Sequence, residues 1–174
     1  MGKRTFRRYA TLLMATCAML SCVKDKQSSP VNAGESIPPF AAVTMKGQNV
    51  SDKDLLGKPS VVVFFSTTCP DCHRQLPEIE SVWLAADGNV NVLAIARDED
   101  RETVSTFWSK KGFTMPCAAP GDRRIYELFD RGSRSGVPLT FVADPEGTVL
   151  LVSDDSKVLS SQEILSITLD RKNR

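Results

Sequence analysis

Apolar residues along the chain fall into two patterns. Continuous runs rich in β-branched and aromatic residues, typical of strands buried on both faces, occur at 60–66, 90–96, 138–143 and 148–152. Segments whose apolar residues recur at spacings of three and four, typical of one face of a helix, occur at 72–83, 104–108, 125–129 and 164–169. Gly112 is the expected stop of the second helix. Strands that alternate with helices in this way predict a βαβ core.

The last two predicted strands are joined by Asp-Pro-Glu-Gly at 144–147, a turn sequence that makes them an antiparallel hairpin. Added to a βαβ core, this C-terminal β-hairpin gives an α/β fold with a mixed central sheet and helices on both faces. The chain of 174 residues has room for one domain with a short N-terminal extension, and no internal repeat is visible.

The first residues have the character of an export signal. Residues 1–21 carry four basic and no acidic side chains, followed by an apolar run that is too short to span a bilayer. Met-Leu-Ser-Cys at 19–22 resembles the bacterial lipobox, so we expect residues 1–21 to be removed and Cys22 to be lipidated. Cys17 is a poorer candidate because the apolar run continues beyond it. An ordinary cleaved signal with an incidental cysteine is the alternative.

Residues 22–36 are polar and lack apolar periodicity, which predicts a flexible tether and leaves 37–174 as the folded domain.

The chain has 22 basic side chains, of which four lie in the predicted signal, so the remainder has 18 basic residues against 21 acidic ones. A nucleic-acid-binding protein would need a clustered basic face. We therefore expect no nucleic-acid partner, and contact with a membrane only through the lipid anchor.

Residues 69–73, Cys-Pro-Asp-Cys-His, match three kinds of site at once. The sequence C-x-x-C-H attaches c-type haem, whereas C-x-x-C is half of a zinc site or a dithiol redox motif. Haem needs a second axial ligand and zinc about four nitrogen or sulfur ligands. The chain has one histidine and, beyond the motif, only Cys117 as a further thiol in the predicted domain. We therefore predict a redox dithiol of Cys69 and Cys72, without metal or cofactor.

The two cysteines lie where the predicted strand 60–66 meets the N-terminus of a helix. Pro70 falls in the first helical turn, where its missing N–H costs nothing. Free backbone N–H groups and the positive end of the helix dipole favour a thiolate there. We expect Cys69, which is nearest the helix end, to be the exposed attacking thiol, and Cys72, one turn further, to be the resolving thiol. Asp71 between them is either a proton acceptor or a solvated turn residue.

Four segments in this order resemble the thioredoxin-fold thiol–disulfide oxidoreductases of the TlpA/ResA type, in the AhpC/TSA–redoxin superfamily. They are Gly-Glu-Ser-Ile-Pro-Pro-Phe at 34–40, the motif-bearing strand at 55–65, Pro77 in the active-site helix, and 136–147 with a proline opposite the site. The resemblance covers about residues 35–170. It implies a thioredoxin-like fold, a cis-proline at Pro138, and binding of the substrate backbone by Val137.

The resemblance also implies a function. The protein would reduce disulfides of exported proteins in the bacterial cell envelope, lipid-anchored to a membrane and facing the periplasm. An upstream membrane or periplasmic thiol reductant would supply the electrons. A dithiol oxidase or isomerase is one alternative. A peroxiredoxin-like thiol peroxidase is another, because Ser66 lies three residues before Cys69, although Val62 replaces the proline of that family.

The sequence departs from the family at the expected proton acceptors. Val63 and Gln75 stand where thioredoxin and ResA-like proteins carry an acidic residue, so Asp71 or water would have to take the proton from the resolving thiol. His73 is expected to be a solvent-facing helix residue, or alternatively a cation that stabilises a thiolate. Cys117 is expected to be a buried, dispensable thiol, with a relay of disulfides from the motif as the alternative.

Overall fold

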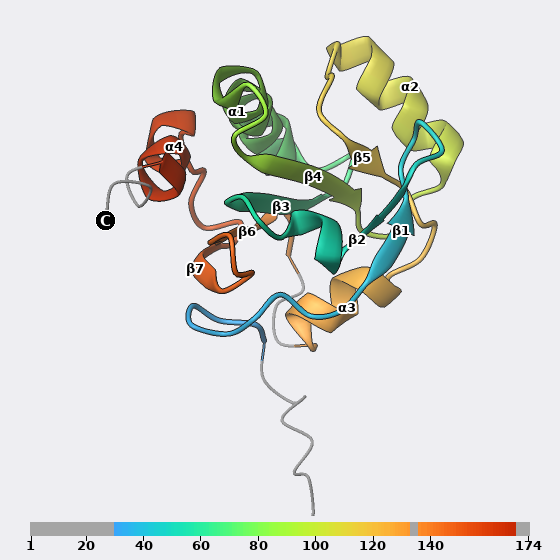
Figure 1. The fold of residues 1–174 in the computed structure, drawn as a ribbon. Helices are drawn as coiled ribbons and strands as arrows, with labels where there is room; N and C mark the ends of the chain where they lie inside the picture. Colours follow the sequence, from blue (N-terminus) through green and yellow to red (C-terminus); the bar gives the residue numbers. More distant parts are fainter. Residues whose placement is uncertain (1–29, 133–135, 170–174) are drawn as a thin grey trace, which may run out of the picture.

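The computed structural model describes residues 30–132 and 136–169. Their centre is a five-stranded sheet with the order β5-β4-β3-β6-β7 (Figure 1). Strands β3, β4 and β5 are parallel, and β6 and β7 form an antiparallel hairpin beside β3. The bounds are Ser60–Phe65 for β3, Asn91–Ala96 for β4, Cys117–Ala118 for β5, Leu139–Ala143 for β6 and Val149–Ser153 for β7. The mixed sheet and the C-terminal hairpin confirm the predicted fold class.

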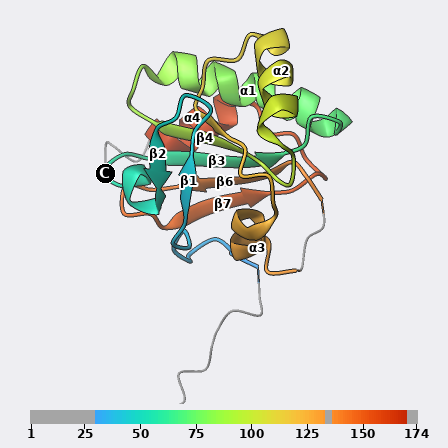
Figure 2. The same cartoon turned by 90° about the vertical axis from the view of Figure 1, so that its right-hand side faces the viewer.

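Helices cover both faces of this sheet, as predicted (Figures 1 and 2). The α-helices within the described residues are α1 at Pro70–Ala86, α2 at Arg101–Lys111, α3 at Arg124–Asp130 and α4 at Ser161–Leu169. Successive side chains of β3 point to opposite faces. Phe64 packs on Phe129 of α3, with 4.9 Å between ring centroids, and Phe65 packs on Trp108 of α2, with 5.2 Å. Helix α3 therefore lies on one face and α2 on the other, and α1 and α4 lie on the same side as α2 (Figure 1).

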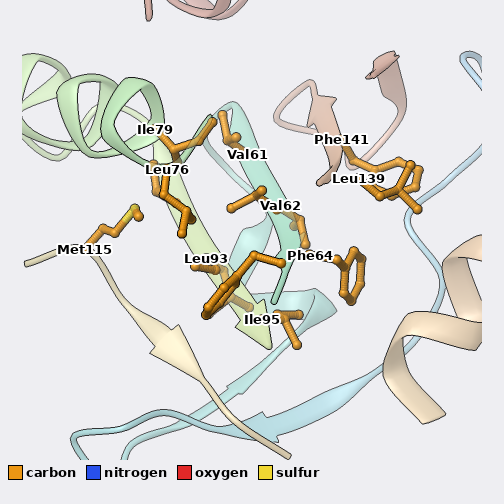
Figure 3. Close-up of a cluster of buried hydrophobic side chains, with 14 of the residues drawn as sticks. Val61, Val62, Phe64, Leu76, Ile79, Leu93, Ile95, Met115, Leu139 and Phe141 are labelled. Atoms are coloured by element: carbon orange, nitrogen blue, oxygen red, sulfur yellow. The ribbon is translucent and has the colours of Figure 1, made fainter. Parts of the chain in front are cut away.

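The core is built around β3, all of whose residues are buried. Side chains from α1, β4 and β6 pack against it, including Leu76, Ile79, Leu93 and Phe141 (Figure 3). A central parallel strand with helices on both faces has no solvated side, which explains the uninterrupted apolar run in its sequence. This rigid strand carries the chain directly to the cysteine motif.

The N-terminal extension runs along the α3 side of the sheet and reaches both of its edges (Figure 1). It forms an isolated bridge to Thr148 at the β7 edge through Ser36, and one to Ala118 of β5 through Thr44. Strand β1 at Ala41–Val43 lies between the two bridging residues in the sequence. Strand β2 at Asn49–Ser51 and a short 3-10 helix, η1, at Asp52–Leu55 follow them. The extension thus occupies backbone positions at both sheet edges, which would otherwise be open to pairing with other chains.

The boundary predicted between tether and domain is wrong at its C-terminal end. Val31 is fully buried in the core, and its N–H donates to the carbonyl oxygen of Phe129. The N–H of Gly34 likewise donates to Val149. Residues 31–36 are polar in composition, but backbone hydrogen bonds and one buried valine fix them to the domain. Residues 31–36 therefore belong to the folded domain rather than to the tether.

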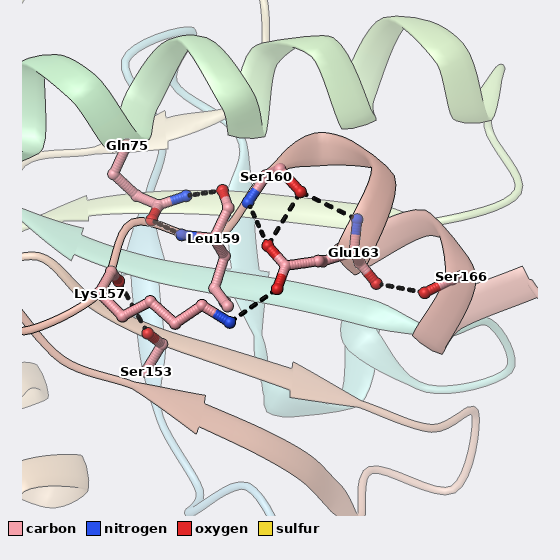
Figure 4. A network of polar contacts seen from close by, with 7 residues as sticks. All are labelled: Gln75, Ser153, Lys157, Leu159, Ser160, Glu163 and Ser166. Atoms are coloured by element: carbon pink, nitrogen blue, oxygen red, sulfur yellow. Dashed lines mark hydrogen bonds and ion pairs between the residues drawn. The ribbon is translucent and has the colours of Figure 1, made fainter.

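Helix α4 begins with a capping box that is linked to the neighbouring segment (Figure 4). The carboxylate of Glu163 accepts hydrogen bonds from the N–H and hydroxyl of Ser160, and the Ser160 hydroxyl accepts from the N–H of Glu163. Lys157 donates to the same carboxylate and, together with the Ser160 bonds, lowers the pKa of Glu163 to about 2.

Within the described residues, no helix is both long enough and apolar enough to cross a membrane.

Candidate active site

The cysteine motif lies at the junction of β3 and α1, as predicted. Cys69 is the N-cap residue of α1, with extended backbone angles, and Pro70 is the first helical residue. The backbone N–H of Cys72 donates to the Sγ atom of Cys69 across 3.3 Å. Sulfur at an N-cap therefore receives one of the helix N–H groups that have no partner within the helix. This placement favours negative charge on the Cys69 sulfur.

The two thiols differ in exposure. Cys69 is partly exposed, whereas Cys72 is fully buried. Burial raises the pKa of the Cys72 thiol well above that of an exposed cysteine, and its hydrogen bond with the Cys69 thiol acts in the same direction. Cys72 is therefore held as a neutral thiol in the reduced protein, and Cys69 is the sulfur that a substrate can reach.

Val137 and Pro138 approach the motif from the segment before β6. The peptide bond between them is cis, as the family resemblance implies. The thiol of Cys69 donates a hydrogen bond to the carbonyl oxygen of Val137 at 3.1 Å. The hydroxyl of Tyr126 donates to the carbonyl oxygen of Gly136 at 3.0 Å and so holds this segment to α3. The predicted binding residues are thus brought together with Cys69.

Two polar residues of α1 lie close to the cysteines in the sequence but differ in environment. The carboxylate of Asp71 forms an ion pair with Arg74 and is partly exposed. Gln75 is fully buried, and its side-chain amide forms two hydrogen bonds with the backbone of Leu159, at 3.0 Å as donor and 2.8 Å as acceptor (Figure 4). Gln75 therefore fixes α1 to the segment before α4, and an amide cannot serve as a base.

The turn between β3 and Cys69 is held by side chains that no local sequence pattern indicates. The carboxylate of Glu99 accepts hydrogen bonds from the N–H and the hydroxyl of Thr67, at 2.8 and 2.5 Å, and from the Ser66 hydroxyl at 3.3 Å. Glu99 follows β4 and lies 32 residues from Thr67 in the sequence. Only the parallel register of β3 and β4, which brings both strand ends to one edge, could have indicated this contact.

The prediction that His73 faces the solvent holds only in part, because the residue is half-buried. Its imidazole stacks on the ring of Phe107 in α2, with 5.2 Å between centroids and 27° between the planes. Its Nε2 atom lies 2.7 Å from the carbonyl oxygen of Thr67. The aromatic partner comes from a helix about 30 residues further along the chain, which spacing within the motif does not reveal.

Cys117 lies away from the motif. It is buried in β5, and burial raises the pKa of its thiol as well. In the sheet it lies beside Ala94, which in turn lies beside Val63. Two strand spacings separate Cys117 from Val63 by roughly 10 Å, and Cys69 lies beyond the end of β3. Disulfide formation needs Cα atoms within about 7 Å, and all three cysteines of the described residues are free thiols. Cys22 lies outside the described residues.

The comparison with known proteins agrees with this arrangement. The sequence pattern of the AhpC/TSA family matches residues 33–152. The chain is 27% identical to the thiol–disulfide oxidoreductase ResA of Bacillus subtilis over 157 residues, which make up 86% of this chain and 84% of that protein.

Solved structures show the same fold. The thioredoxin domain of a thiol–disulfide oxidoreductase from Bacteroides vulgatus superimposes with a TM-score of 0.68 at 18% identity, covering 81% of this chain and 98% of that one. A thiol:disulfide interchange protein of the thioredoxin family from Chlorobium tepidum gives a TM-score of 0.65 at 27% identity, covering 80% and 97%. Fold and relatives together define a thioredoxin-fold thiol–disulfide oxidoreductase of the TlpA/ResA type. The chain belongs to the AhpC/TSA family.

Proposed function

We propose that the protein reduces disulfides of other proteins through a dithiol of Cys69 and Cys72. One observation carries this proposal. The partly exposed Cys69 sulfur lies between the N–H of Cys72 and the carbonyl oxygen of Val137. The first contact stabilises negative charge on sulfur, and the second brings a backbone hydrogen-bonding group to the place where a substrate disulfide would dock.

The proposed reaction proceeds in two exchange steps. The Cys69 thiolate attacks one sulfur of the substrate disulfide, and the other substrate sulfur leaves as a thiolate that takes up a proton. The Cys72 thiol then loses its proton to Asp71 or water and attacks the Cys69 sulfur, which releases the second substrate thiol. The protein is left with a Cys69–Cys72 disulfide and the substrate with two thiols. A thiol reductant of the envelope restores the dithiol.

The segment before β6 would hold the substrate during these steps. Its backbone at Val137 is aligned beside the attacking sulfur, and Pro138, which follows it, has no N–H. An extended substrate could pair with Val137 by β-type hydrogen bonds, which recognise a backbone without regard to its side chains. Such recognition suits a reductase of several exported proteins.

We further propose that the protein acts at the cell envelope, anchored through lipid on Cys22 and facing the periplasm. The basic and then apolar start of the chain and the lipobox-like sequence support this proposal. A periplasmic site also supplies the substrates, because disulfides persist in that compartment.

The reductase direction can be tested by the reduction potential of the Cys69–Cys72 pair in glutathione buffers. The negative charge of Asp71 raises the pKa of the Cys72 thiol, and a group that opposes thiolate formation makes the disulfide harder to reduce. We expect a potential closer to about −270 mV, as in thioredoxin, than to about −120 mV, as in a strong oxidant. Insulin reduction by the wild type and by Cys69→Ala should show full activity and no activity, respectively. A strongly oxidising potential would instead favour the oxidase or isomerase alternative.

The peroxidase alternative makes a different prediction for the same protein. Among the described residues, the Ser66 hydroxyl bonds to Thr68 and Glu99, and no bond to the Cys69 sulfur is found. The Ser66 hydroxyl is therefore engaged with Thr68 and Glu99. Hydrogen peroxide consumption with a thiol reductant should be slow compared with insulin reduction, and the opposite order would favour the peroxidase.

A further inference from the structure

Thr67 is bound from two sides by side chains of other elements. Glu99 accepts from its N–H and its hydroxyl, and the Nε2 atom of His73 lies 2.7 Å from its carbonyl oxygen. Every polar group of Thr67 is therefore engaged by a side chain. Thr67 is two residues before the proposed attacking cysteine, so these contacts act on the turn that positions it.

The contact with Thr67 determines which nitrogen of His73 carries a proton. A carbonyl oxygen only accepts hydrogen bonds, so Nε2 must be the donor. Nε2 carries a proton both in this neutral tautomer and in the imidazolium, and the contact is available to either form. The ring plane is fixed from α2, because Phe107 stacks on it with 27° between the planes.

We propose that His73 is a positioning residue for Cys69, which acts by holding Thr67 against Glu99. The proposal rests on the proposed function in one respect, the attack of Cys69 on the substrate disulfide. In the described structure, the imidazole of His73 hydrogen bonds to Thr67 and stacks on Phe107, so it acts on the sulfur through the turn. It stabilises the one conformation of the turn in which that sulfur meets the helix N-terminus.

The path from Thr67 to the sulfur is short. The N–H of Cys69 donates to the carbonyl oxygen of Ser66 at 3.3 Å, and the N–H of Thr68 donates to the Ser66 hydroxyl at 3.3 Å. Both bonds are long for N–H donors, so they leave the turn weakly fixed by itself. The 2.7 Å contact from His73 and the contacts from Glu99 supply the remaining constraint. Without them, fewer molecules would hold the Cys69 sulfur over the N–H of Cys72.

Two substitutions separate the hydrogen bond of His73 from its ring. His73→Phe keeps a ring against Phe107 but removes the donor, whereas His73→Gln loses the ring and keeps an amide donor. We expect His73→Phe to lower the second-order rate constant of the reduced protein with oxidised glutathione by about two- to tenfold, the range of one hydrogen bond. His73→Gln should recover part of that loss. Lys111→Gln, which changes a different neighbour of Phe107, should react like the wild type.

A merely structural role for His73 would give another outcome. It would lower the thermal midpoint of His73→Phe and leave the rate constant at the wild-type value, which would overturn the proposal. Equal losses in His73→Phe and His73→Gln would overturn it too, because the donor would then be irrelevant. Cys69→Ala in the same assay tests the proposed function itself. If Cys69→Ala retains the reaction, the proposed function fails, whatever the His73 variants do.

A spectroscopic test needs no substitution. The chain has one histidine, so nitrogen NMR of an untagged, histidine-labelled protein shows a single imidazole. At a pH at which the ring is neutral, we expect the proton on Nε2, with slow exchange against solvent. A proton on Nδ1, or a tautomeric mixture like that of a free imidazole, would contradict the hydrogen bond to Thr67 and with it the proposal.

Discussion

The thiol of Cys69 donates a hydrogen bond to the backbone carbonyl oxygen of Val137, 68 residues further along the chain. This bond exists only while the sulfur carries its proton. When Cys69 ionises, the carbonyl oxygen of Val137 loses its donor and becomes available to a backbone N–H of the substrate. Thiolate formation and substrate docking are therefore expected to favour each other at this site.

The buried thiol of Cys72 predicts a loss of stability at alkaline pH. Its pKa is raised, mainly by burial, so the folded protein keeps this proton where the unfolded chain loses it, above about pH 8.5. The unfolding free energy should then fall with rising pH, by at most about 1.4 kcal/mol per pH unit for this thiol. The measurement is urea denaturation of the reduced and oxidised forms across this range.

The control for this prediction is the other buried thiol. Burial raises the pKa of Cys117 in the same direction, so both forms should be compared in a Cys117→Ala background. There, the oxidised protein has no Cys72 thiol and should lack the alkaline loss. Parallel pH profiles of the two forms would show that Cys72 titrates normally.

Gln75 predicts a structural rather than a chemical role for this position of α1. In Gln75→Leu, the N–H and carbonyl of Leu159 lose their buried partners, and we expect a loss of about 1 to 3 kcal/mol in unfolding free energy. Gln75→Glu is the matched control, because a protonated carboxyl group can donate and accept like the amide. Its stability should approach that of the wild type at acidic pH and fall as the pH rises. Unchanged stability of Gln75→Leu would contradict the role.

Cys117 is predicted to be dispensable for turnover. It is buried in β5 and the register of the sheet keeps it apart from the motif. Cys117→Ala should reduce insulin at a rate within about twofold of the wild type, with only a stability loss from the missing sulfur. A folded Cys117→Ala protein that has lost most of its activity would instead establish the relay.

The lipid anchor is predicted from the first residues alone. Cells grown with a radioactive fatty acid should label the wild-type protein and leave Cys22→Ala unlabelled. Cys17→Ala is the matched control and should be labelled like the wild type. Equal labelling of the wild type and Cys22→Ala would exclude lipidation at Cys22.

Much of the fold follows from local sequence patterns. The strands at β3, β4, β6 and β7 have continuous apolar runs, and the Asp-Pro-Glu-Gly turn indicates the hairpin. The start of α1 could be predicted because Pro70 suits the first turn of a helix, where its missing N–H costs nothing. By contrast, β1 and β2 have three residues each, none of them buried, so they give no periodic signal.

The contacts around the motif could not be predicted in the same way. Gln75 and Leu159 are 84 residues apart, and Glu99 and Thr67 are 32 apart. These hydrogen bonds depend on how loops lie against their neighbours once the sheet has formed. The partner of Gln75 is the backbone of Leu159, and because any residue carries such a group, the sequence does not indicate it. The contact of His73 could not be predicted for the related reason that Phe107, on which its imidazole stacks, belongs to another helix.

The central claim, that Cys69 attacks the substrate and Cys72 resolves, is tested most directly by trapping the intermediate. Without the resolving thiol, the mixed disulfide between Cys69 and the substrate should not be cleaved within the protein. Cys72→Ala, expressed in its native envelope, should therefore accumulate covalent adducts with other proteins that reductant removes, and Cys69→Ala should show none. Mass spectrometry should place the bond at Cys69. Adducts in Cys69→Ala that are absent from Cys72→Ala would contradict the account.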